Sequence, residues 1–372
     1  MMVLLLTVVV GAAALAINWS YLTSVFSHMQ QAVDTIALAA APKILDDAVL
    51  CDMTCDNIDE QVETKTVATV YRNLVNSLAA TQLHLQDADV TCTLGNIADT
   101  RLRLDDFSFT AGAPANALKI VAHRSAGGAN PVTHLISGLT STDTADVVAT
   151  SYALLDNQVV GFCPRTNVLA PVIPLAIDRA AFDARVGDLD GDGIREFMLL
   201  LNSTDPAATD DATGALVDLG GAAIDLTRIQ TQVDAGGLSA ADLPGGKLGP
   251  LGIGPTLAYP NNPNPLLLSA EQDSPAEATI ETIIASLQAI AASDNPTRVF
   301  PVYTSVASGD ASVVDFIAAN VISAIDESEG ATPERQRLKV TIEPCYLIHT
   351  TAWTKTDAAP RDVYVRRLRL IR

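Results

Sequence analysis

The N-terminal end of the chain is apolar from Met1 to Ile17 apart from one hydroxyl, that of Thr7. A helix of this length rises about 1.5 Å per residue and extends roughly 26 Å, the short end of what crosses a hydrocarbon core of about 30 Å. Because a bilayer offers the backbone no hydrogen-bond partners, a spanning segment must be helical. Trp19 and Tyr21 follow, and such rings gather at the membrane–water interface. The pattern predicts an N-terminal transmembrane helix.

The helical spacing continues beyond this apolar segment, now among Ser, Thr, Gln, His and Asp. Apolar side chains recur there at steps of three or four residues, at Tyr21, Val25, Met29, Val33 and Ile36. This spacing predicts an amphipathic extension of the same helix, with one apolar face that another element must cover.

A cleaved signal peptide is the alternative interpretation of this end of the chain. Residues 3–10 would form its apolar region, and Ala14-Leu15-Ala16 has the small-x-small form of a cleavage site. The absence of a basic residue before Lys43 and the unbroken helical spacing after Ala16 favour a retained anchor. Both interpretations place the rest of the chain outside the cytoplasm.

Downstream of an acidic connector at residues 42–60, apolar runs predict a β-rich body at residues 61–372. Expected strands cover residues 87–109 as a hairpin, 117–124, 147–162 with a break at Asp156-Asn157, 197–201, 298–306, 338–348 and the end of the chain. Expected helices cover residues 62–80, 274–290 and 313–325. The predicted fold class is therefore α+β: an anchor helix at residues 1–41, then an extracytoplasmic β-rich body with a few packed helices and a sub-boundary near residue 270.

Net charge and cysteine content limit the partners and metal sites that we expect. The formal net charge is −20, and such a chain repels nucleic acid, so we expect no nucleic-acid partner. The five cysteines are an odd number. Cys51 and Cys55 are close enough in sequence for a local disulfide or for two free thiols. Zinc is not expected there, because no second cysteine pair or histidine lies at zinc-finger spacing.

The stretch Asp188-Leu189-Asp190-Gly191-Asp192-Gly193-Ile194-Arg195-Glu196 has two interpretations. Alternating Asp side chains with a final Glu can surround Ca²⁺, which gives the candidate ligands Asp188, Asp190, Asp192 and Glu196. Leu199 stands where an EF-hand needs its bidentate acid, which excludes that motif. The other interpretation is an Asp/Gly turn that leads into a strand. Calcium is the one cofactor that we consider, and its role would be structural.

We find no pattern typical of an enzyme. The five histidines are scattered without an H-E-x-x-H pair, and no G-x-S-x-G elbow is present. The residues before Gly246-Lys247 lack the glycine spacing of a P-loop, and Leu248 stands where that motif has Ser or Thr. We therefore expect a protein that is not an enzyme.

Residues 6–42, LTVVVGAAALAINWSYLTSVFSHMQQAVDTIALAAAP, resemble the N-terminal segment of TadG-like proteins of the Tad/Flp (tight adherence) pilus-assembly system. Those chains also run from an apolar helix through a Tyr-Leu pair, here Tyr21-Leu22, to a Gln-rich turn and an Ala-rich segment. They usually carry Arg or Lys before the apolar run, where this chain begins with two Met. The resemblance continues through residues 116–182, covers most of the chain, and is strongest at residues 1–41 and 298–317.

The resemblance implies a single-pass protein of the cytoplasmic membrane whose bulk is extracytoplasmic. It implies pilus-assembly and pilin-like membrane proteins as partners, a structural and adhesion-related role, and no catalytic residues. We expect the stripe of Tyr21, Val25, Met29, Val33 and Ile36 to pack on partner helices. The alternative function is an exported, calcium-stabilised binding or adhesion module with a cleaved signal peptide.

Overall fold

A computed structural model describes most of the chain, and its contacts divide the chain into two compact units. The described residues are 2–45, 85, 89–97, 107–108, 115–136, 143–191, 193–201, 213–217, 219, 226–243, 246–248, 256–257, 275–305, 311–326, 338–354 and 364–371. Unit 1 comprises residues 1–45, 56–156 and 368–372, and unit 2 comprises residues 46–55 and 157–367. The division falls after Asp156, and it places the N-terminal helix in the same unit as the strands up to that point.

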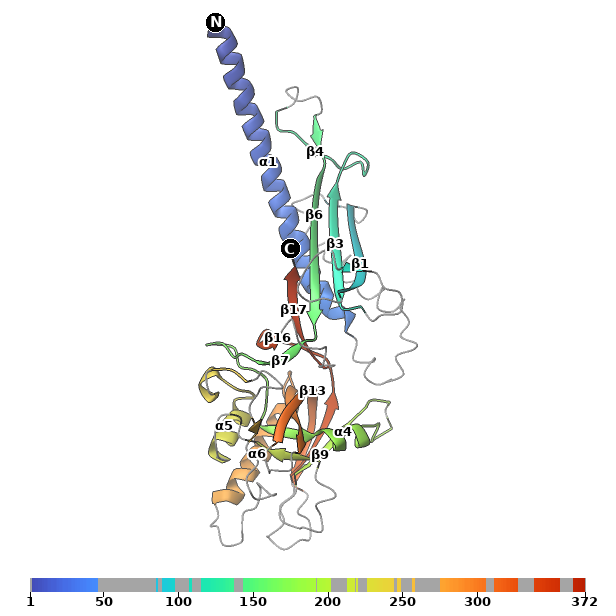
Figure 1. Cartoon of the computed structure of the whole chain (residues 1–372), viewed down its shortest axis with the longest axis vertical. Coiled ribbons are helices and arrows are strands. Elements are labelled where there is room, and N and C mark those ends of the chain that lie inside the picture. Colours follow the sequence, from blue (N-terminus) through green and yellow to red (C-terminus); the bar gives the residue numbers. More distant parts are fainter. Residues whose placement is uncertain are drawn as a thin grey trace. The chain divides into compact units, whose positions relative to one another are not determined.

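Unit 1 begins with one continuous helix, α1 (Met2–Ala40), followed by the 3₁₀ turn η1 (Ala41–Ile44). The segment is rich in Ala and Leu and has no interior proline, so nothing interrupts its backbone hydrogen bonds. Pro42 has no N–H to donate, and it lies just beyond the point where the α-helix ends. The predicted long apolar helix at this end of the chain is confirmed (Figure 1).

The sheet of unit 1 has the strand order β17-β6-β3-β1-β2. Its strands are β1 (Val90–Ile97), β2 (Phe107–Ser108), β3 (Ala117–Arg124), β6 (Val147–Asp156) and the last residues of β17 (Val365–Ile371). Pairing of β1 with β2 and β3, and of β3 with β6, is antiparallel. A short hairpin of β4 (Val132–Thr133) and β5 (Thr144–Ala145) extends from it.

Helix α1 packs against β6 and β3, and this contact builds the core of unit 1 (Figure 1). Leu118, Ile120 and Ala122 alternate with more exposed residues along β3, so that one face of the sheet is buried. Met29, Val33 and Ile36 of α1 are also fully buried. The Gln30 amide Nε2 donates to the Thr150 carbonyl of β6 at 2.9 Å and to Asp34 Oδ1 at 2.9 Å, which ties the helix to the sheet.

Unit 2 is built on a seven-stranded sheet with the order β10-β8-β12-β13-β14-β9, to which β11 adds by pairing with β13. The strands are β8 (Leu175–Asp178), β9 (Phe197–Leu201), β10 (Gly214–Leu216), β11 (Thr256–Leu257), β12 (Thr297–Ser305), β13 (Ala311–Asp326) and β14 (Leu338–Pro344). The pair β8–β12 is parallel, and the other pairs are antiparallel. A separate ribbon joins β7 (Val159–Phe162) to β16 (Ala352–Thr354), and β15 (Leu347–Ile348) pairs with the start of β17.

The central sheet of unit 2 is buried on both faces. Helices α4 (Arg179–Arg185), α5 (Leu226–Asp234) and α6 (Pro275–Ala291) contribute to one core, through Phe182, Ile229 and Leu287 among others. The second core contains residues of the β7–β16 ribbon and of the segment around the 3₁₀ turn η6 (Ala240–Asp242), and Phe162 meets Phe316 edge-on in it. Strands buried on both faces lack a simple alternation of polar and apolar residues.

Most of the predicted elements are confirmed, one is wrong, and the strand expected at residues 338–348 is divided into β14 and β15, which belong to different sheets. β3 has the predicted bounds, the break at residues 156–157 separates β6 from β7, and α6 matches the predicted helix. The helix expected at residues 313–325 is instead the long strand β13, which lies between β12 and β14. The helix predicted at residues 62–80 and the pair Cys51 and Cys55 lie outside the described residues.

Candidate functional site

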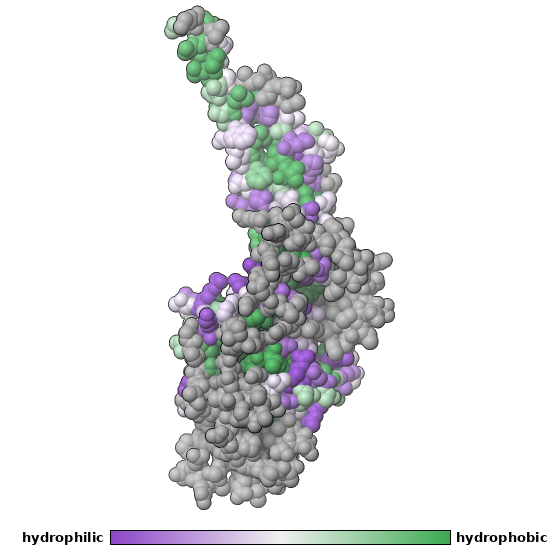
Figure 2. Space-filling view, viewed as in Figure 1, coloured by the Kyte–Doolittle hydropathy of each residue, from purple (hydrophilic) through white to green (hydrophobic). Residues whose placement is uncertain are grey.

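The first half of α1 is apolar and exposed. Met2 is 88% exposed, Leu6 65% and Val10 58%, in a segment where burial would be the favourable state in water. Figure 2 shows the hydrophobic surface of this segment in green. The Thr7 hydroxyl donates to the Val3 carbonyl at 2.9 Å, so the lone polar side chain of the segment bonds within its own helix. The helix is long and apolar enough to cross a membrane, a test that an N-terminal signal sequence also passes.

Asn18 marks the point where α1 is first fastened to its unit by a side chain that bonds to another segment. Its amide Nδ2 donates to the Ile136 carbonyl at 2.9 Å, and the Ile136 N–H donates to Asn18 Oδ1 at 3.0 Å. The side chain is buried and matches one backbone donor and one backbone acceptor. The next residue, Trp19, is 75% exposed. A buried polar anchor therefore adjoins an exposed aromatic ring of the kind that lies at membrane interfaces.

In the second half of α1, the predicted apolar stripe lies under strands of the same unit. Val25, Met29, Val33 and Ile36 are buried, and Tyr21 is half-buried. The sequence identified a face that something must cover, and in this structure β6 and β3 cover it. Packing of this stripe on a partner helix stays a prediction, and such a partner would have to displace the sheet.

The Asp/Gly stretch forms a closed turn in unit 2. Asp188 accepts hydrogen bonds from the N–H groups of Gly191 (2.6 Å) and Gly193 (3.1 Å), both of which have positive φ. Gly187 and Glu196 close the loop by backbone hydrogen bonds in both directions. One carboxylate of the candidate calcium set is thus used to hold the turn. Asp192 lies outside the described residues, so the full ligand set of Asp188, Asp190, Asp192 and Glu196 is not placed.

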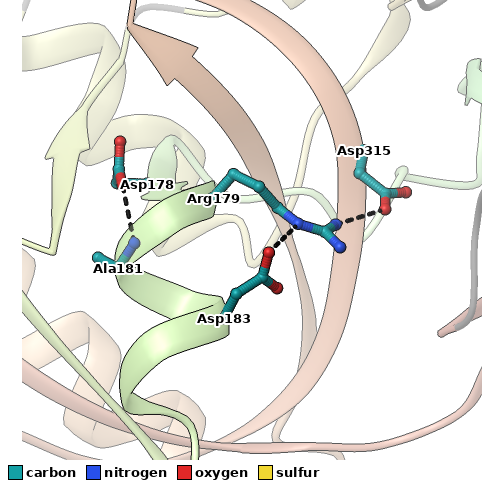
Figure 3. A network of polar contacts seen from close by, with 5 residues as sticks. All are labelled: Asp178, Arg179, Ala181, Asp183 and Asp315. Atoms are coloured by element: carbon teal, nitrogen blue, oxygen red, sulfur yellow. Dashed lines mark hydrogen bonds and ion pairs between the residues drawn. The ribbon is translucent and has the colours of Figure 1, made fainter.

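A charged network that sequence reasoning missed fastens α4 to the sheet of unit 2 (Figure 3). Arg179 donates from Nε to Asp183 at 2.9 Å and from Nη1 to Asp315 on β13 at 3.0 Å, while Asp178 caps α4 by accepting from the Ala181 N–H at 2.9 Å. Burial lowers the pKa of Arg179, but the two carboxylates outweigh it and raise that pKa above its ordinary value. The four-residue spacing predicts only the contact with Asp183, because Asp315 is distant in sequence. The network joins α4 to β13 of the central sheet.

The described cysteines are free thiols, at Cys92, Cys163 and Cys345. Burial raises the pKa of Cys92 to about 11, so it carries almost no thiolate at neutral pH. Burial also lowers the pKa of His349, whose Nδ1 lies 2.7 Å from the Thr351 hydroxyl. Among the residues that the structure describes, no three potential metal ligands come together.

These features define a class of protein. A long helix is exposed in its first half and packed on an antiparallel sheet in its second half, and this unit is followed by an α+β unit. Comparison of the chain with known protein families, with curated proteins and with solved structures gives no match.

Proposed function

We propose that the protein is a TadG-like, membrane-anchored structural component of Tad/Flp pilus assembly, with its two units on the extracytoplasmic side. One observation carries the proposal: the single unbroken helix α1 is apolar and exposed in its first half and packed against the sheet of unit 1 in its second half. The sequence resemblance of residues 6–42 to TadG-like chains supports the same assignment.

The continuity of α1 suits a mechanical role. A helix keeps its backbone hydrogen bonds along its whole length, so a load on the body passes to the anchor without a flexible joint. Asn18 and Gln30 fasten the helix to the body by side-chain hydrogen bonds, and Met29 is fully buried with it. The anchor is therefore built into the fold of unit 1.

Pilin-like partners would meet the bare half of α1. The stripe from Val25 to Ile36 is occupied by the chain's own strands, whereas residues such as Leu6 and Val9 are exposed. In lipid, helices associate through close packing of their side chains, which requires an accessible helix surface. We therefore propose that contacts with pilin-like helices lie within the membrane, at residues 2–17.

The first experiment determines the N-terminal residue and the membrane partition of the full-length protein expressed in its own host. A chain that keeps Met1, or an upstream start, and stays in the membrane fraction is the expected result. A soluble chain that begins at Ile17 would contradict the anchor. Asn18 and the packed half of α1 would survive that cleavage, so an exported binding module would then be the better assignment.

The partner is tested with a photo-crosslinking amino acid at Val9, with Thr35 as the matched control on the exposed side of the packed half. We expect adducts with pilus-assembly membrane proteins from position 9 and none from position 35. Crosslinks to no other membrane protein from position 9 would contradict the partner assignment while leaving the anchor intact.

Calcium belongs to the alternative, the exported binding module. If Asp190 is a ligand, calcium raises the Tm of the EDTA-treated protein, and Asp190→Ala abolishes that rise. Asp188→Ala lowers Tm with or without calcium, because Asp188 accepts two backbone hydrogen bonds of the turn. An equal Tm in calcium and in EDTA would leave the simple Asp/Gly turn as the correct interpretation.

A further inference from the structure

An open groove lies on the sheet face of unit 1 that α1 does not cover. Its volume is about 530 Å³, within the range of roughly 300–1,000 Å³ typical of small-ligand sites. The groove is lined by Asp89, Thr91, Val121, His123, Ser125, Gly127, Gly128 and Val148. Neither the membrane anchor nor the Asp/Gly turn accounts for it.

Strand pairing explains why these side chains meet. Thr91 of β1 lies opposite Val121 of β3, and His123 of β3 lies opposite Val148 of β6. Residues directly opposite each other share a face, and so do residues two apart in one strand. Thr91, Val121, His123 and Val148 therefore form the floor, and the buried set of Leu118, Ile120 and Ala122 points the other way.

The turn after β3 forms a fixed polar wall. The Ser125 hydroxyl accepts from the Gly128 N–H at 3.2 Å, and the Ala126 N–H donates to Asp146 at 3.0 Å. Asn130 donates from Nδ2 to Asp89 Oδ2 at 2.6 Å, which holds that nearly buried carboxylate in the groove. A methyl group placed on Gly128 would lie 3.5 Å from Asp89 Oδ1, so the turn passes close to the acid.

The lining mixes hydrogen-bonding groups with two apolar patches. Asp89 is an acceptor, and Thr91, Ser125 and His123 can each donate and accept. Val121 and Val148 add aliphatic surface, and Val148 is 47% exposed. None of the described residues that line the groove is Lys or Arg, which disfavours an anion, and the one carboxylate and one imidazole among them are too few ligands for a divalent cation.

We propose that this groove binds a neutral saccharide, with one pyranose unit in contact with the floor. Sugar hydroxyls donate and accept, as the groups around Asp89 do, and the C–H face of a pyranose suits the two valines. The site would give unit 1 a glycan-binding, adhesive function. This inference does not depend on the anchor or on Tad/Flp pilus assembly.

Saturation-transfer difference NMR on the full chain in nanodiscs tests the site. The probes are methyl α-D-mannopyranoside, methyl α-D-glucopyranoside, methyl β-D-galactopyranoside and N-acetylglucosamine. We expect a saturable signal with at least one of them, weakened several-fold by His123→Ala and at least tenfold by Gly127→Tyr. Gly127 has an ordinary φ, and a methyl group there would meet only Ser125 Oγ, at 3.9 Å, so the tyrosine can enter the groove without backbone strain.

The matched control is Gly187→Tyr in unit 2, where a methyl group would meet nothing within 4 Å. That variant keeps the signal if the groove is the site. Absence of a saturable signal with all four probes overturns the proposal, as does a signal that Gly127→Tyr leaves unchanged. Saturable binding of inorganic phosphate with none of the glycosides would overturn it in favour of an anion site.

Discussion

The two halves of α1 have similar apolar side chains and opposite surroundings. Leu6 and Val9 are exposed, whereas Met29 and Val33, further along the same helix, are fully buried. The difference lies in the polar residues between them. Residues 2–17 contain one hydroxyl that bonds within the helix, whereas Asn18 and the residues after it include polar side chains that bond to other segments. Polar groups that bond to other segments thus mark where the protein itself begins to surround the helix.

The largest effects come from placing a charge in each half. Met29 is fully buried, so Met29→Asp takes a carboxylate out of water and removes apolar contacts, and we expect unit 1 to lose at least about 3 kcal/mol of unfolding free energy. Val9→Asp should leave the Tm of unit 1 unchanged. It should weaken membrane insertion by about 2.5–3.5 kcal/mol. Thermal melting and membrane partition of both variants test this exchange of effects.

A loss of body stability in Val9→Asp, or an unchanged Tm in Met29→Asp, would show that the two halves are not divided as the structure places them. We expect Met29→Asp also to destabilise the sheet that covers the stripe. Loss of a partner in that variant would therefore not identify a partner-binding face.

An ion pair joins two strands, β17 and β6, of the sheet that packs against the second half of α1. Arg369 of β17 donates to Asp156 of β6 at 3.2 Å, and the Asp156 side chain is fully buried. Arg369→Met removes this ion pair from a buried carboxylate, and we expect a loss of about 3 kcal/mol in urea unfolding of unit 1. Lys339→Met in unit 2 serves as the control. An effect below about 0.5 kcal/mol would mean that this pair does not support the sheet.

Asn18→Ala releases the first side-chain attachment between α1 and another segment of unit 1. It removes two hydrogen bonds and leaves the Ile136 N–H and carbonyl without those partners, at a cost of about 1–3 kcal/mol. We expect faster amide hydrogen exchange at Ile136 and unchanged exchange at Thr150, where Gln30 fastens the helix. Equal exchange at Ile136 in both proteins would show that Asn18 does not hold this loop.

A further effect is a loss of stability at alkaline pH. Burial raises the pKa of Cys92 from 9.0 to about 11, so the folded protein binds that proton more tightly than the unfolded chain. The resulting stability is complete below pH 9 and falls as the pH rises toward 11. Cys92→Ala should remove this fall from unit 1. Tyr364→Phe should not, because Tyr364, whose pKa burial raises to about 12, belongs to unit 2.

Two Ile- and Val-rich segments of unit 2 show where the sequence predicts the secondary structure correctly and where it does not. Residues 274–290 and 313–325 both have apolar residues at steps of three and four, and both predict a helix. The first is α6, whose Ile283, Leu287 and Ile290 line one core. Its Pro and Glu at the start and Asn295-Pro296 at the end supply start and stop signals. The second is β13, which lacks such signals.

Two bulges explain the misleading spacing in β13. Register shifts fall where Val302 and Tyr303 pair with Asp315 and Val313, and again between Val321 and Ser323. Each extra residue reverses which face the following side chains occupy. Val313 therefore contributes to one core and Ile317 to the other, although a helix would place them on one face. The strand is buried on both faces, so its sequence also lacks the alternation that identifies a half-exposed strand.

By itself, the sequence determined the elements whose signals are local: the long apolar helix, the alternating strands β1, β3 and β6, and the helix α6 with its start and stop signals. Tertiary structure alone decided that β13 is a central strand, that β6 and β3 cover the stripe of α1, and that Thr91, His123 and Asp89 line one groove. Each of these depends on segments far apart in the chain. A periodic apolar face states only that it needs a cover, and the free energy of burying it is nearly the same whichever element provides that cover.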